Sequence, residues 1–142
     1  MLWFAKPKIN YAGEMREFLK EYMLFYIKEN PLAANDVVPV FSDAELLIRR
    51  LPEKEIARTI RINNVNSECC ALNILQNVAM SAIKQQSATD FLKGYDKDYA
   101  YELYKSINDL KLEKGYIDKQ QHEENNLAAT RMAIKLPLDR WL

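Results

Sequence analysis

The sequence predicts an all-α protein: a single domain over residues 1–142, in which five to six helices pack around one apolar central helix. Three observations support this prediction. The 142-residue chain has only three Gly and five Pro, fewer than the many turns of a β-sandwich need. Apolar residues recur at helical spacing along most of the chain. No charged residue occurs between Glu68 and Lys84, although charged residues make up 28% of the sequence.

The uncharged stretch predicts the central helix, which spans about residues 66–86. One apolar face has the spacing of a helix and consists of Leu72, Leu75, Val78, Ala79, Ala82 and Ile83. A second flank widens this face, with Cys70, Ala71 and Ile74. The polar edge that remains consists of Asn73, Asn77, Ser81 and Lys84. A helix that is apolar on most sides is usually enclosed by other helices, so we expect this one to be buried.

Three helices and one long connection are predicted before the central helix. Residues 10–29 form the first helix, which stops because the residue before a proline avoids the helical region. Its solvated side is expected to carry Glu14, Arg16, Glu17, Lys20, Glu21 and Lys28. Residues 31–41 then form an extended connection, either strand or loop. Residues 42–51 form a short helix that opens with the capping box Ser-Asp-Ala-Glu, and residues 52–63 form the next one, with Pro at its first position.

Two more helices are predicted after the central helix. The first spans about residues 96–114, and Gly115 ends it in the left-handed conformation that commonly follows a helix. The second spans residues 119–136, because Asp118 can cap its start and Pro137 cannot continue it.

The composition excludes several classes of protein. Twenty basic and twenty acidic residues give a net charge of zero, whereas proteins that bind nucleic acid by counterion release usually have a basic excess. No secretory signal is recognised, because Lys6 and Lys8 interrupt the apolar start, and no apolar run is long enough to cross a membrane. Adjacent Cys69 and Cys70 cannot bridge to each other within a helix, so we expect two buried thiols in a reducing compartment. The predicted location is the cytoplasm.

No recognisable catalytic or metal-binding pattern occurs in the chain. His122 is the only histidine, and a zinc protease motif would need a second one at position 126, which is Asn. A di-iron bundle motif would need Glu at position 119, which is Lys. The Gly-rich phosphate loop and the Gly-x-Ser-x-Gly elbow are also missing. The sequence therefore predicts a protein that is not an enzyme and uses no metal and no cofactor.

Residues 55–68 look like the first helix and turn of a helix-turn-helix, but they depart from that motif. Arg61 stands where the turn commonly has Gly, and Ser67 stands where an apolar residue is expected. The following helix has no Lys or Arg between Ile62 and Ile83 that could contact bases. A basic stripe nevertheless suits a phosphate or an acidic partner, and it consists of Arg49, Arg50, Lys54, Arg58 and Arg61. The alternative is an ordinary surface helix whose cations pair with nearby glutamates.

Tyrosines and carboxylates alternate in one segment near the start of the helix over residues 96–114. The candidate partner-binding residues are Tyr95, Asp96, Asp98, Tyr99, Tyr101, Glu102 and Tyr104. Tyrosine is enriched at protein interfaces because its ring adds contact area and its hydroxyl adds a hydrogen bond at little cost in entropy. The alternative for this segment is that two or three of the rings are half-buried core residues with their hydroxyl groups in water.

From these observations we predict a non-enzymatic protein-binding module. In its most concrete form it is a small cytoplasmic inhibitor of the bacterial immunity or antitoxin type, which blocks the active site of a basic toxin or nuclease domain through the tyrosine-rich segment. The alternative is a helix-turn-helix-like regulator that binds nucleic acid through the stripe from Arg49 to Arg61, although the zero net charge argues against it. A third alternative is a structural homo-oligomer. A membrane is not an expected partner.

Overall fold

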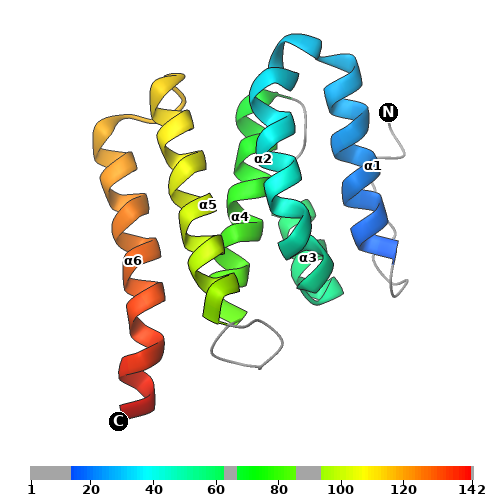
Figure 1. Cartoon of the computed structure of the whole chain (residues 1–142). Helices are drawn as coiled ribbons and strands as arrows, with labels where there is room; N and C mark the ends of the chain where they lie inside the picture. The colour runs from blue at the N-terminus through cyan, green and yellow to red at the C-terminus, as the bar shows by residue number, and fades with distance from the viewer. Residues whose placement is uncertain (1–13, 63–66, 86–93, 142) are drawn as a thin grey trace.

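The computed structural model describes residues 14–62, 67–85 and 94–141, and these residues form helices without any strand, which confirms the predicted fold class. The described helices are α1 (Glu14–Glu29), α2 (Pro31–Arg50), α3 (Glu53–Ile62), α4 (Glu68–Gln85), α5 (Gly94–Glu113) and α6 (Lys119–Trp141). Figure 1 shows α1 and α6 at opposite ends of the array, with α2, α4 and α5 between them.

The central position of α4 is confirmed. This helix packs against α2, α3, α5 and α6. Its fully buried apolar side chains include the predicted face and most of the second flank: Ala71, Leu72, Ile74, Leu75, Val78, Ala79, Ala82 and Ile83. The predicted polar edge is more exposed, because Asn73, Asn77 and Ser81 are partly exposed and Lys84 is exposed. The two cysteines differ from the prediction: both are free thiols, but they are only partly buried at the first turn of the helix.

Residues 31–41 are the largest departure from the sequence prediction. They form the first half of α2 rather than a strand or a loop, so the predicted capping box at Ser42 lies in the interior of a helix. The buried residues of α2 have helical spacing across the whole element: Val37, Phe41, Ala44, Leu47 and Ile48. Burial of this continuous face against α1 and α4 stabilises the helix on both sides of Pro39.

Pro39 is tolerated because its defect faces solvent. A proline inside a helix removes one backbone hydrogen bond and leaves the carbonyl group four residues earlier, here that of Asn35, without a helical partner. Both Asn35 and Pro39 are exposed, so water can bond to this carbonyl group.

We expect the substitution Pro39→Ala to raise the free energy of unfolding by about 1–2 kcal/mol. In a helix interior, proline is less favourable than alanine by about 3 kcal/mol. Proline also lowers the conformational entropy of the unfolded chain, and this effect offsets part of that difference. Urea denaturation of both proteins measures the change. Pro31→Ala is the matched control, because Pro31 lies at the start of α2, where no backbone donor is needed. A loss of stability in Pro39→Ala would contradict this account.

The end of α6 also differs from the prediction. The helix continues past Pro137 to Trp141, because a single proline removes one backbone hydrogen bond without necessarily ending a helix. The connection before α6 has the predicted geometry, since Gly115 has a φ of 79° and the Asp118 carboxylate accepts a hydrogen bond of 2.8 Å from the Gln121 backbone N–H.

Arg16 joins α1 to the junction between α2 and α3. The sequence placed this residue on the solvated side of the first helix, but its Nε–H donates to the Ile48 carbonyl oxygen at 3.0 Å. A second guanidinium nitrogen donates to the carbonyl oxygen of Leu51, and a third pairs with the carboxylate of Glu53. One side chain therefore binds the carboxyl-terminal end of α2 and the first residue of α3.

Candidate functional site

The predicted tyrosine-rich segment lies on α5, and three of its rings are packed between helices. Tyr104 is buried in the core, where burial raises the pKa of its hydroxyl group. Tyr99 is partly buried and its hydroxyl group donates to the Asp43 carbonyl oxygen of α2. Tyr101 is partly buried, and its hydroxyl group shares a hydrogen bond of 2.7 Å with Thr130 of α6. These rings therefore connect α5 to its neighbours, and only parts of Tyr99 and Tyr101 remain accessible.

The outer face of α5 is acidic. Asp98, Glu102, Asp109 and Glu113 are all exposed, and at 100° per residue they fall within an arc of about 60°. Two of these carboxylates have a side-chain partner. Glu102 Oε1 lies 3.6 Å from Lys105 Nζ, and Asp109 Oδ1 lies 2.7 Å from His122 Nε2. We name these four carboxylates the acidic face of α5.

The sequence prediction found half of the acidic face. Asp98 and Glu102 were candidates, whereas Asp109 and Glu113 were missed, although their seven- and eleven-residue spacing from Glu102 was a readable helical signal. The side chains of the candidates Tyr95 and Asp96 lie outside the described residues.

The basic stripe lies where α2 meets α3. Arg49, Lys54 and Arg58 are exposed, Arg50 is partly buried, and the side chain of Arg61 lies outside the described residues. A guanidinium nitrogen of Arg58 lies 3.7 Å from Glu55 Oε2. This pairing of residues three apart is what an ordinary surface helix is expected to show. The helix that would read bases in a helix-turn-helix is α4, which four other helices cover. A nucleic-acid site would therefore rest on the stripe alone.

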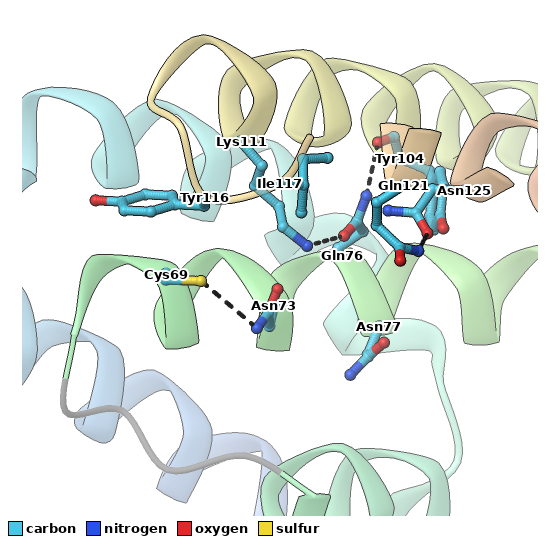
Figure 2. A pocket seen from close by; sticks show the side chains of 10 residues that line it. All are labelled: Cys69, Asn73, Gln76, Asn77, Tyr104, Lys111, Tyr116, Ile117, Gln121 and Asn125. Atoms are coloured by element: carbon cyan, nitrogen blue, oxygen red, sulfur yellow. Dashed lines mark hydrogen bonds between the residues drawn. The ribbon is translucent and has the colours of Figure 1, made fainter. Parts of the chain in front are cut away.

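A polar cavity that the sequence prediction missed lies between α4, α5, the link after α5 and the first turns of α6. Its volume is about 390 Å³, and side-chain amides line much of it: Asn73, Gln76, Asn77, Gln121 and Asn125. Lys111 also lines it, although only 6% of this lysine is exposed. Its Nζ donates to Gln76 Oε1 at 2.8 Å, and Figure 2 shows this bond together with that from Gln76 Nε2 to the Tyr104 carbonyl oxygen. Burial lowers the pKa of Lys111.

Lys111 could have been found in the sequence by its spacing. It lies seven residues after Tyr104 and four residues after Ile107, both of which are buried, so it occupies a core position of α5. The sequence alone, however, did not indicate that a cavity lies in front of this position.

Beside the cavity, Lys114 has the carboxylate partners that Lys111 lacks. Lys114 Nζ lies 2.5 Å from Asp36 Oδ2 and 2.7 Å from Glu68 Oε1, and these hydrogen bonds raise the pKa of Lys114. The Tyr116 hydroxyl group also donates to Glu68, and this bond raises the pKa of Tyr116 to about 12. This cluster connects α2, α4 and the end of α5.

The Tyr116 hydrogen bond predicts a pH-dependent stability. A tyrosine whose pKa is higher in the folded state than its ordinary value of 10 contributes stability below pH 10 and loses it as the pH rises towards 12. We expect Tyr116→Phe to cost about 0.5–1 kcal/mol at pH 8, in the lower part of the usual range because the residue is 39% exposed. The difference from the unsubstituted protein should shrink between pH 10 and 12. Urea denaturation across this range measures it, and a constant difference would contradict the assignment.

Amide side chains also hold α5 to α6. Asn108 is fully buried and its Nδ2 donates to the His122 carbonyl oxygen and to Asn126 Oδ1, both at 2.9 Å. Asn125 donates back to Asn108 Oδ1 at 2.9 Å and accepts from Gln121 at 2.8 Å. This network fixes the two amides of α6 that line the cavity.

Within the described residues, no three His, Cys, Asp or Glu side chains gather in a way that could hold a metal ion. None of the described helices combines the length and the apolar character that a membrane span requires. Comparisons with protein-family models, with curated proteins and with solved structures found no match to this chain.

Proposed function

We propose that the protein is a non-enzymatic protein-binding module that presents the acidic face of α5 to a basic surface of another protein. The observation that carries this proposal is the alignment of Asp98, Glu102, Asp109 and Glu113 on one exposed side of the helix. At 1.5 Å per residue these carboxylates extend over about 22 Å. Asp98 and Glu113 have no ion-pair partner among the described residues, so their charge is available to a partner.

The chemistry of this face suits a partner that itself binds phosphate groups. Nucleases and other nucleic-acid-binding enzymes present clefts lined by Lys and Arg, and a row of carboxylates is complementary to such a cleft. Long-range attraction would accelerate association, and the helix would then block the cleft sterically. The most specific form of the proposal is an inhibitor of the immunity or antitoxin type acting on a basic toxin in the bacterial cytoplasm. The accessible parts of Tyr99 and Tyr101 would add contact area beside the carboxylates.

Charge reversal tests the proposal. The chain is co-expressed with the products of its neighbouring genes, and co-purified partners are measured by titration calorimetry at several salt concentrations. The variant carries Asp98→Lys and Glu102→Lys on α5. Its matched control carries Glu17→Lys and Glu21→Lys, which make the same charge change at exposed positions of α1. Figure 1 shows α1 and α5 on opposite sides of α2 and α4.

We expect the α5 variant to bind at least about tenfold more weakly than the control, and we expect affinity to fall as salt rises. Equal affinity of the two variants for a neighbouring gene product would overturn the proposed binding face.

The second candidate function is a phosphate-binding or nucleic-acid-binding surface at the basic stripe. It is favoured by the exposure of Arg49, Lys54 and Arg58 where α2 meets α3. This function predicts binding to duplex DNA that weakens steeply with salt, and loss of that binding in Lys54→Glu. Fluorescence anisotropy of a labelled duplex at low salt measures it, and unchanged anisotropy would exclude the stripe as a DNA site.

A further inference from the structure

The cavity between α4 and α5 holds a buried cation without a counter-ion. An ammonium group has three N–H donors, and the described residues supply one acceptor to Lys111, the Gln76 amide oxygen at 2.8 Å. Lys111 is 6% exposed and Gln76 is 5% exposed, so bulk water reaches neither group freely. Lys114, three residues later and just after the end of α5, shows the contrast, because its ammonium group pairs with two carboxylates, those of Asp36 and Glu68.

A purely structural role does not explain this arrangement. Burial of a charge without an opposite charge is costly, and an apolar side chain of similar length would fill the same position more favourably. The Gln76 amide bonds to Lys111 with its oxygen and to the Tyr104 carbonyl oxygen with its nitrogen, at 2.8 and 3.5 Å. This arrangement holds the ammonium group at the cavity, as Figure 2 shows.

The rest of the cavity wall can donate hydrogen bonds but carries no negative charge. No Asp or Glu lines the cavity, so Lys111 is its one charged side chain among the described residues. Asn77 has no hydrogen-bond partner among the described residues, and Asn73 has only a long contact of 3.9 Å to the Cys69 sulfur. On the opposite wall, Gln121 and Asn125 are fixed by the hydrogen bond between them.

We propose that this cavity binds a small organic acid whose carboxylate group pairs with Lys111 Nζ. The amides of Asn73 and Asn77 donate to the remaining oxygen atoms of the acid, and Gln121 and Asn125 close the other side. A volume of about 390 Å³ is large enough for a small dicarboxylate. An anion at this place supplies the counter-charge that the fold leaves out.

The site is independent of the proposed binding face. At 100° per residue, Tyr104 and Lys111 lie roughly opposite the acidic face of α5, so the cavity and the carboxylates occupy different sides of one helix. Variants at one site can therefore be tested without changing the other.

The test is a nuclear magnetic resonance titration of the full chain that follows the side-chain amide signals of Gln76, Asn77 and Gln121. The probes are succinate, its neutral diamide, and inorganic phosphate, each at constant ionic strength. The key variant is Lys111→Met, which keeps the length of the side chain and removes its charge. Lys105→Met is the matched control, since Lys105 lies on the same helix near Tyr101 and Glu102, away from the cavity.

We expect succinate to shift the three amide signals and the diamide to leave them unchanged. Loss of one partner of a buried charge pair costs at least about 2 kcal/mol, so Lys111→Met should bind succinate at least about 30-fold more weakly, whereas Lys105→Met should bind normally. Lys111→Met should also be at least as resistant to urea as the unsubstituted protein, which shows that lost binding does not arise from unfolding. Binding of phosphate alone, equal binding of the diamide, no shifted amide signal with any probe, or unchanged succinate binding by Lys111→Met would each overturn the proposal.

Discussion

Leu75→Ala is expected to lower the free energy of unfolding by about 3–5 kcal/mol. Leu75 is fully buried in α4, and four other helices enclose that helix. Truncation removes the favourable transfer free energy of the leucine side chain and also leaves a cavity. The closely packed neighbouring helices cannot move in far enough to close this cavity. A domain of this size is typically stable by about 5–15 kcal/mol, so this single change would remove a large share.

Urea denaturation, with the slope and the midpoint fitted separately, measures this effect. The matched control is Leu127→Ala on α6, where the side chain is 52% exposed and truncation should change stability by about 0.5 kcal/mol or less. A loss of under 1 kcal/mol in Leu75→Ala would mean that α4 is not the tightly enclosed centre of the bundle.

Arg16→Ala is expected to cost about 2 kcal/mol, although Arg16 is a charged residue near the surface. Its guanidinium group contacts the carbonyl oxygens of Ile48 and Leu51 and the carboxylate of Glu53. Hydrogen bonds that involve a charged group contribute about 1.5–3 kcal/mol when they are partly buried. The positive charge also lies at the carboxyl-terminal end of α2, where it interacts favourably with the helix dipole.

Arg16→Lys separates the shape of the guanidinium group from its charge. A lysine ammonium group cannot reach two carbonyl groups and a carboxylate in a planar arrangement, so this variant should recover less than half of the loss. Arg131→Ala, at an exposed position of α6, should be nearly neutral. Full stability of Arg16→Lys would show that charge alone acts at this junction.

These stability variants also help to interpret the functional tests. The carboxylates chosen on α5 are exposed, so their substitution should leave the unfolding midpoint nearly unchanged. A lost partner or a lost ligand can therefore be assigned to the acidic face or to Lys111 rather than to unfolding, provided that the urea midpoint is measured for each variant.

Several features of this protein were determined by the sequence itself. The all-helical class and the central position of residues 68–85 follow from apolar spacing and from the uncharged stretch, which are properties of neighbouring residues. The left-handed Gly115 and the cap at Asp118 are equally local, since the residue types involved have few other ways to satisfy the backbone. The sequence also placed Asp98 and Glu102 among the candidate residues, but it left open how far the nearby tyrosines are buried.

Only the tertiary structure decided the remaining features. Residues 31–41 are helical because α1 and α4 bury a continuous face of α2, which outweighs the local breaking tendency of Pro39. Arg16 bonds to Leu51, and Lys111 bonds to Gln76, each across 35 residues of sequence. Local spacing cannot specify such pairs, because they depend on how whole helices pack. For the same reason, the cavity in front of Lys111 became visible only when α4, α5 and the start of α6 were in place.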